Sequence, residues 1–221
     1  FEVRSVECIE RCGVELHRAL TGGDRLVSSA KSRENGAKRS VKSGVIHAGE
    51  FQCVSAGSGI RHRETNPSRT QWAHLFQIWL RPSQAGLEPR HEQKRFSAAE
   101  RRGGLCVVAS PDGRRGSLSI RQDAVVYSAL LDPGKHVVHE LSQGRSAWLH
   151  LVQGAVTLGD IVLTTGDGAG FTAERAVSLT AREETEILLL DIGEQRSRSP
   201  ANGFRAAART LGVAVVGSSV L

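Results

Sequence analysis

A histidine and a glutamate two positions apart are the residues of this sequence best suited to bind a metal ion. They are His62 and Glu64, in the stretch SAGSGIRHRETN at residues 55–66. On an extended strand, side chains two positions apart point to the same side. An imidazole nitrogen beside a carboxylate oxygen suits Fe(II), Mn(II), Ni(II) or Zn(II). The alternative is that both are solvated side chains of an exposed strand, because such a pair also arises by chance.

The sequence around His62 is longer than this pair and resembles a known family. Gly59, His62 and Asn66 form the pattern G-x-x-H-x-x-x-N, which resembles the second metal motif of the cupin superfamily. The stretches AGEFQCVSAGSGIRHRETNPS, HLFQIWLRP and PRHEQKRF resemble the pirin family, and most of all its bacterial quercetin 2,3-dioxygenase branch. The resemblance runs from about residue 44 to about residue 193. It implies an all-β fold of the cupin superfamily, with two β-barrel (jelly-roll) domains in tandem.

The resemblance also implies a site and a reaction. In that family the N-terminal barrel binds a divalent metal, usually iron, through three histidines and one glutamate. His62 and Glu64 match the second half of this set. Glu64 would be both a ligand and the catalytic base that removes the 3-hydroxyl proton of a flavonol, which then reacts with dioxygen and loses carbon monoxide.

The first metal motif of the family, H-x-H-x-x-x-E, has no match here. It should lie near residues 17–20, where His17 is present but Ala19 stands in place of the second histidine. We therefore expect an incomplete site and a weak or inactive dioxygenase. Whether His17 is a third ligand stays open. Two other readings also stay open: a non-enzymatic pirin-like regulator that binds a protein partner, and a remnant without chemistry.

The charge distribution narrows the possible partners. The net charge is +6, but residues 44–195 carry 16 Lys and Arg against 17 Asp and Glu. The basic excess therefore lies at the two ends, which argues against direct nucleic-acid binding by the folded body. No apolar run is long enough to span a bilayer, so we expect no membrane contact.

Short strands are predicted from residue 44 onward, because β-branched and aromatic runs alternate with Gly, Pro, Asp and Ser. The runs are 50–56, 73–80, 105–110, 117–120, 124–131, 135–141, 147–158, 161–165, 176–181 and 186–192. Such strands at this spacing are typical of a barrel or sandwich.

Four regions follow from these patterns. Residues 1–43 are a divergent segment, polar enough to be a mobile loop if left alone. Residues 44–104 are the remainder of the first barrel, with the metal half-site, and residues 105–193 are a metal-free second barrel. Residues 194–221 are a basic tail with a short helix expected at 204–211. We hypothesise that the first and last regions come from out-of-frame or unrelated coding sequence.

The remaining histidines are expected to be structural or at the surface. In the second barrel no histidine follows Gly168 at the spacing of a metal motif. His136 and His139 should face opposite sides of their strand, because they are three positions apart. His74 is expected to pack inside a barrel, the alternative being an added ligand. The other members of this group are His91 and His150.

The cysteines and the first residues of the sequence give expectations about cellular location and processing. Cys8, Cys12, Cys53 and Cys106 form no CxxC motif or regular framework, which favours reduced, buried thiols and a cytoplasmic protein. The sequence opens on Phe1, contains no methionine and has no secretory signal, which indicates a truncated or processed product.

Overall fold

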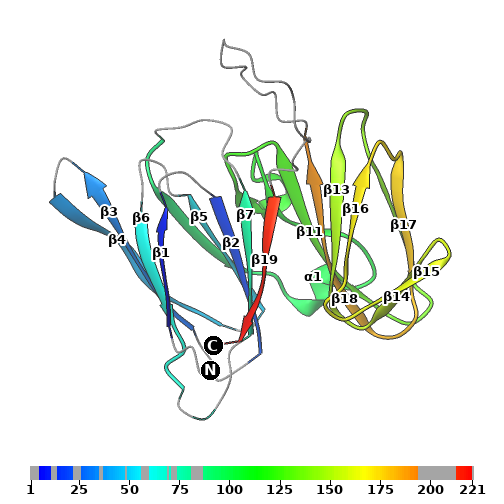
Figure 1. Cartoon of the computed structure of the whole chain (residues 1–221), viewed down its shortest axis with the longest axis horizontal. Coiled ribbons are helices and arrows are strands. Elements are labelled where there is room, and N and C mark those ends of the chain that lie inside the picture. The colour runs from blue at the N-terminus through cyan, green and yellow to red at the C-terminus, as the bar shows by residue number, and fades with distance from the viewer. Residues whose placement is uncertain are drawn as a thin grey trace, which may run out of the picture.

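Strands make up nearly all of the regular structure in the computed structural model of this chain (Figure 1). The structure describes residues 5–10, 14–21, 26–34, 37–47, 49–55, 60–68, 70, 74–80, 87–193 and 213–220. For the described residues up to 43, for 60–62, for 64 and for 213–220 it describes the backbone only. The expected all-β fold is confirmed.

Two sheets form the N-terminal half of the molecule. One has the strand order β1-β6-β3-β4 and the other β19-β7-β2-β5-β8. Their strands are β1 (Ser5–Glu10), β2 (Val14–Thr21), β3 (Leu26–Glu34), β4 (Ala37–Ile46), β5 (Glu50–Ser55), β6 (Ile60–Thr65), β7 (His74–Leu80), β8 (Arg90–Arg95) and β19 (Val213–Val220). We call the first the outer sheet and the second the central sheet.

Two further sheets form the C-terminal half, on the right in Figure 1. A six-stranded sheet has the order β10-β9-β11-β18-β13-β16, and a four-stranded sheet has the order β12-β17-β14-β15. Their strands are β9 (Cys106–Ser110), β10 (Leu118–Ser119), β11 (Ala124–Leu131), β12 (His136–Glu140), β13 (Ser146–Gln153), β14 (Ala155–Leu158), β15 (Ile161–Thr164), β16 (Gly168–Thr172), β17 (Ala176–Ala181) and β18 (Thr185–Ile192).

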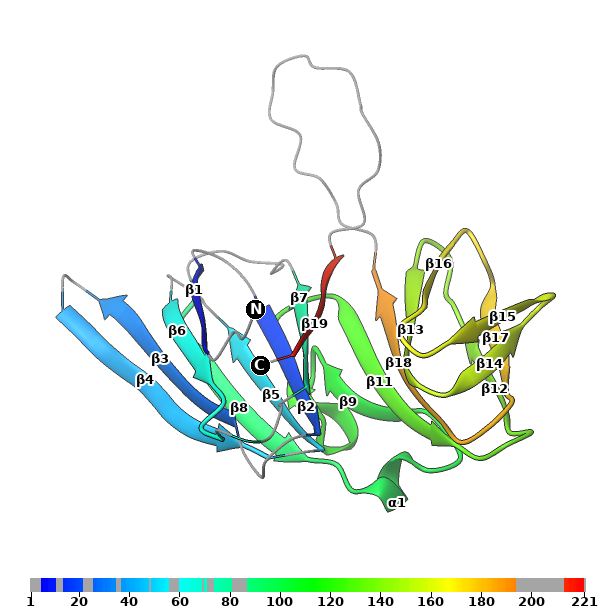
Figure 2. The same ribbon diagram turned by 60° about the horizontal axis from the view of Figure 1, so that its bottom comes forward.

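The two ends of the chain also contain strands. The segment 1–43 contains β1 to β3 and most of β4, and β2 pairs with both β5 and β7 within the central sheet. The basic tail contains β19, which pairs antiparallel with β7 (Figure 2). Both end segments therefore supply strands to the first barrel. The helix expected at 204–211 lies outside the described residues.

The middle strands β11 and β18 of the six-stranded sheet are buried on both faces. Leu188, Leu190 and Ile192 of β18 join a cluster that includes Phe51, Cys53, Phe76 and Ile78 of the central sheet. Ile187 and Leu189, on the opposite face, join a second cluster inside the C-terminal barrel. This double burial explains why β18 reads EILLLDI, a nearly continuous apolar run rather than an alternating one.

A short connection joins the two halves. Residues Ala98–Arg101 form helix α1, whose N-terminus is closed by a capping box between Ser97 and Glu100. Arg101 is buried and its Nη1 donates to Glu186 Oε1 at 2.8 Å and to Ser128 Oγ at 3.3 Å. These charge-assisted bonds tie the connection to strands β11 and β18 of the second barrel.

Candidate functional site

His62 and Glu64 lie on β6, at alternate positions of the outer sheet. The register pairs His62 with Cys8 of β1 and with Ala30 of β3, and it pairs Glu64 with Val6 and Ser28. Directly paired residues in antiparallel strands share a face of the sheet. The sequence prediction that both residues occupy one face of a strand agrees with this register.

That face is the one directed into the first barrel. Ile46 of β4 pairs with Leu26, which shares a face with Ser28 and therefore with Glu64. Ile46 is fully buried, whereas Arg63, between His62 and Glu64, is exposed. The positions of His62 and Glu64 are thus on the buried side of the outer sheet.

Two further donor residues occupy nearby register positions. Cys8 is the direct cross-strand neighbour of His62, a relation that the spacing of the cysteines in the sequence does not reveal. His17, on β2, pairs with Gln52 and Gln77 in the central sheet. Among the residues whose side chains are described, no group of three His, Cys, Asp or Glu could hold a metal ion. Cys8, His17, His62 and Glu64 are outside that set.

The central sheet presents a polar face to the outer sheet. Phe51, Cys53, Phe76 and Ile78 face the C-terminal half, so the alternate positions face the inside of the first barrel. These include Gln52, which is 1% exposed, and Val54, Leu75, Gln77 and Trp79. His17 shares this face by register. A barrel interior with amide and indole groups differs from an interior filled only by aliphatic side chains, because its polar groups require partners.

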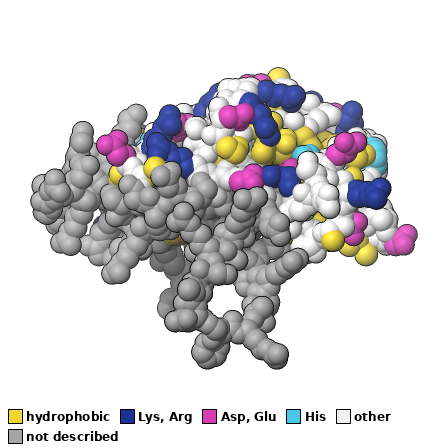
Figure 3. All heavy atoms as spheres, turned by 90° about the horizontal axis from the view of Figure 1, so that it is seen from above, with side chains coloured by type: hydrophobic (Ala, Val, Ile, Leu, Met, Phe, Trp, Pro, Cys, Tyr) yellow, Lys and Arg dark blue, Asp and Glu magenta, His cyan; other side chains and the backbone are white. Residues whose placement is uncertain are grey.

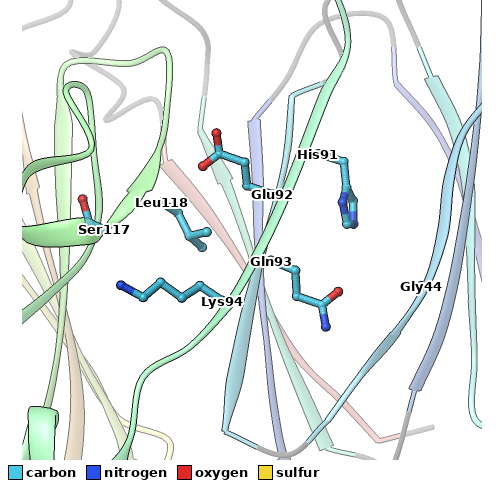
Figure 4. Close-up of a pocket in the computed structure, with 7 residues that line it drawn as sticks. All are labelled: Gly44, His91, Glu92, Gln93, Lys94, Ser117 and Leu118. Carbon is cyan, nitrogen blue, oxygen red and sulfur yellow. The ribbon is translucent and has the colours of Figure 1, made fainter.

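Strand β8 connects the sheets around a hollow of about 470 Å³ (Figure 4). Gln93 and His91 point to one side of β8, toward the strand that carries Gly44, and Glu92 and Lys94 point to the other side. Gln93 Nε2 donates to Val45 O at 2.6 Å and to Glu50 Oε2 at 2.7 Å. His91, expected at the surface, is partly buried.

The other side of this hollow belongs to the second barrel. Glu92 Oε2 accepts from Ser119 N at 2.9 Å, and Lys94 Nζ donates to Gly116 O. These bonds attach β8 to the segment around β10. The hollow is thus bordered by side chains that hold the two barrels together, rather than by a convergent set of reactive groups.

The second barrel contains a polar cluster of its own. His139 Nε2 and Asp191 Oδ2 are 2.8 Å apart, and Arg145 Nε donates to Asp191 Oδ1. Burial alone would raise the pKa of Asp191, but the hydrogen bonds from His139 and Arg145 outweigh it and the pKa is lowered. His136 is exposed and within hydrogen-bond distance of Thr180, on the opposite face of β12 as predicted. His136 and His139 are thus a surface and a structural histidine.

A pair of histidines lies where the two barrels meet. The rings of His74 and Phe76 are 5.0 Å apart, as are those of Phe76 and His150. The Nε2 atoms of both histidines are buried without a hydrogen-bond partner among the described residues. Burial lowers the pKa of His74, and burial lowers that of His150 as well, with a smaller opposing effect from Asp167. Both imidazoles are therefore neutral packing groups at neutral pH.

The described surface carries both signs of charge. On the face in Figure 3, Lys and Arg side chains are interspersed with Asp and Glu rather than gathered by sign. Val138, Ile161 and Val162 are exposed large apolar residues. Of the thiols with described side chains, Cys53 is buried, Cys106 is partly buried and both are free. None of the described helices is long and apolar enough to cross a bilayer.

Family models match two parts of the chain. The model described as Pirin matches residues 38–80, and the model described as Quercetinase C-terminal cupin domain matches residues 107–192. The quercetin 2,3-dioxygenase of Escherichia coli K12 is 43% identical over 147 residues. That match covers 66% of this chain, and the chain spans 62% of the length of that relative.

Solved structures agree with these matches. The crystal structure of YhhW from Escherichia coli superposes with a TM-score of 0.74 at 35% identity, covering 87% of this chain and 76% of YhhW. The structure of the bacterial pirin YhhW in complex with nickel(II) gives a TM-score of 0.73, also at 35% identity, covering 86% of this chain and 77% of that one.

Proposed function

We propose that this chain, which belongs to the pirin family of cupin proteins, holds a divalent metal ion in its N-terminal barrel and acts as a flavonol 2,3-dioxygenase. The observation that carries the proposal is the register of β6. It puts His62 and Glu64 at alternate positions of the buried face of the outer sheet. The relatives named above support the substrate class, and the nickel(II) complex of YhhW supports a divalent ion.

The donor types fit a first-row divalent metal. His62 offers an imidazole nitrogen and Glu64 a carboxylate oxygen, and such nitrogen–oxygen sets bind Fe(II), Ni(II) and Zn(II). Two donors leave most of the coordination sphere open. Cys8 and His17 are the chain's own residues at register positions from which a third donor could come. We propose iron as the ion, with nickel as the competitor to test.

In the proposed reaction the metal ion and the chain's residues would have separate roles. A bound metal ion supplies Lewis acidity toward the 3-hydroxyl and 4-ketone oxygens of the flavonol. The Glu64 carboxylate accepts the proton of the 3-hydroxyl group, which makes the ring more electron-rich and open to reaction with dioxygen. The apolar contacts of Val54 and Leu75 exclude water from the barrel interior.

Metal content and flavonol turnover test this function together. The purified chain is loaded anaerobically with Fe(II) or Ni(II), its metal content is measured, and quercetin absorbance is followed after air is admitted. We expect one ion per chain and a loss of quercetin absorbance that Glu64→Gln abolishes. Glu184→Gln, at a side chain 72% exposed in the second barrel, is the matched control and leaves turnover unchanged.

The outcomes separate the parts of the proposal. A metal-loaded protein without turnover overturns the dioxygenase and leaves a metal-binding cupin. If turnover persists in Glu64→Gln, a group other than Glu64 is the catalytic base. A chain that binds neither ion after loading contradicts the metal site itself.

A further inference from the structure

Trp79 carries a buried hydrogen-bond donor that no described residue satisfies. Its Nε1 atom is inaccessible to solvent and has no partner among the described residues. An indole nitrogen can only donate, and a buried donor without an acceptor lowers stability. Such a group in a native protein requires an explanation, and an absent ligand is one.

The position of Trp79 favours a ligand inside the first barrel. Trp79 lies on the face of β7 opposite to Phe76 and Ile78, which pack between the two barrels. It therefore shares the interior face of the central sheet with Gln52 and Gln77. Gln52 is 1% exposed, so this face is polar as well as buried.

The register also places Trp79 at the end of the barrel where β6 begins. Glu15 of β2 pairs with Trp79 on one side and with Val54 of β5 on the other. Val54 is the penultimate residue of β5, and β6 starts at Ile60 after the connecting residues 56–59. His62 is two positions into β6. Trp79 and His62 are thus near the same end of the two facing sheets.

From these observations we propose that the indole N–H of Trp79 donates a hydrogen bond to an oxygen of a flat aromatic ligand bound in the first barrel. This rests on the proposed flavonol chemistry and deepens it, since it names a positioning residue for the same substrate class. The indole ring adds a planar surface on which an aromatic ring can stack. Carbonyl and hydroxyl oxygens of the ligand are the acceptors that the donor lacks.

Trp148 provides a matched control within the same chain. Its Nε1 is also buried without a partner among the described residues. Trp148 faces the other way, however: it packs against the cluster between the barrels and over Gly168 and Gly170. A Cβ added at Gly168 would come within 2.4 Å of the Trp148 ring, so this indole is closely covered by protein. The same chemical change at the two tryptophans therefore separates a ligand role from packing.

The test is a quercetin titration of the metal-loaded full chain without oxygen, followed by absorbance. Trp79→Phe keeps the aromatic ring and removes the N–H. We expect its Kd for quercetin to rise about tenfold, the value of one hydrogen bond. Trp148→Phe should leave Kd within about twofold. In the unliganded protein the Tm of Trp79→Phe should fall no more than that of Trp148→Phe, because neither donor has a partner to lose among the described residues.

A measurement on the unmutated chain covers the case in which Trp79→Phe does not fold. The indole ¹H–¹⁵N resonance of Trp79 should move downfield when quercetin is added, and that of Trp148 should not. Equal Kd values for wild type and Trp79→Phe, or an unmoved Trp79 resonance, overturn this inference and leave the proposed function standing. If quercetin binding depends on Trp79 but no turnover occurs, the proposed function is overturned and this inference stands. No quercetin binding by the wild type overturns both.

Discussion

The interiors of the two barrels are built from different residues. The second barrel is filled by aliphatic side chains such as Leu149, Leu151, Ile187 and Leu189, each at most 1% exposed. The central sheet of the first barrel instead turns Gln52, Gln77 and Trp79 inward. The same architecture thus serves a packed core in one half and a polar interior in the other.

The difference indicates which half carries chemistry. An aliphatic interior is stabilised by burial and by close packing of its side chains. A buried indole N–H without a partner among the described residues is costly unless something satisfies it. The proposed metal half-site lies in the polar barrel, and the second barrel has a paired polar cluster around Asp191.

The largest expected effect on stability comes from creating a cavity in the core of the second barrel. Leu149→Ala removes a side chain with no solvent exposure, and should lower the free energy of unfolding by about 2–5 kcal/mol. Val138→Ala, at a side chain 52% exposed, should change it by less than about 0.5 kcal/mol. Denaturant unfolding measures both. A loss of bound metal in Leu149→Ala without global unfolding would contradict the division between the two barrels.

The next effect tests whether the paired cluster of the second barrel is structural. Asp191→Asn removes the charge that Arg145 and His139 contact, and should cost about 2–3 kcal/mol. Asp132→Asn breaks an exposed pair with Arg102 and should cost less than about 1 kcal/mol. Because the pKa of Asp191 is lowered, this stabilisation is present above the ordinary value of 3.8 and is lost as pH falls through the folded pKa. Equal losses in the two variants would mean that the cluster is solvated.

The boundary between the barrels should respond to acid. His74 and His150 have pKa values below the ordinary 6.5, so the unfolded chain binds more protons below pH 6.5 and stability falls there. At His150, Asp167 opposes this lowering of the pKa and His74 adds to it. We expect His150→Gln to reduce the fall in Tm between pH 7 and pH 5 by about 2–4 °C. His136→Gln, at an exposed histidine, is the control. An unchanged pH profile in His150→Gln would mean that water reaches His150 at this interface.

The smallest effect concerns the polar bridge of the first barrel. Gln93→Ala removes the bond to Val45 O, which joins β8 to β4, and the bond to Glu50 Oε2 of β5, and should cost about 0.5–1.5 kcal/mol. Denaturant unfolding gives the size of this loss. Flavonol affinity should not change, because Gln93 connects the sheets at the hollow beside β8. A weaker flavonol complex in this variant would extend the ligand site to β8.

Apolar runs with regular punctuation were sufficient to predict most of the second barrel. The run 124–131 coincides with β11, and 186–192 covers nearly all of β18. Strand β8, with the sequence RHEQKR, is absent from the predicted strands because it has no apolar alternation. Its two faces contact polar groups, Val45 and Glu50 on one side and Ser119 and Gly116 on the other, so hydrophobic periodicity does not mark it.

The candidate site was only half predictable for a related reason. His62 and Glu64 are two residues apart, so a strand brings them together locally. Cys8 and Trp79 join the same barrel interior only through pairing between distant strands. Sequence spacing carries no information on such registers. The strands of the first 43 residues were missed because their composition is polar.

The pairing of β19 with β7 has a consequence for how the protein is made. Val213 pairs with Leu80, so the whole second barrel is synthesised between these two partners. On the ribosome, β9 to β18 emerge before the strand that covers the edge of β7. During this time the β7 edge of the first barrel is not covered by β19, and a strand of another chain could pair with it. The central sheet of the barrel with the polar interior thus receives its last strand only after the whole second barrel has been synthesised.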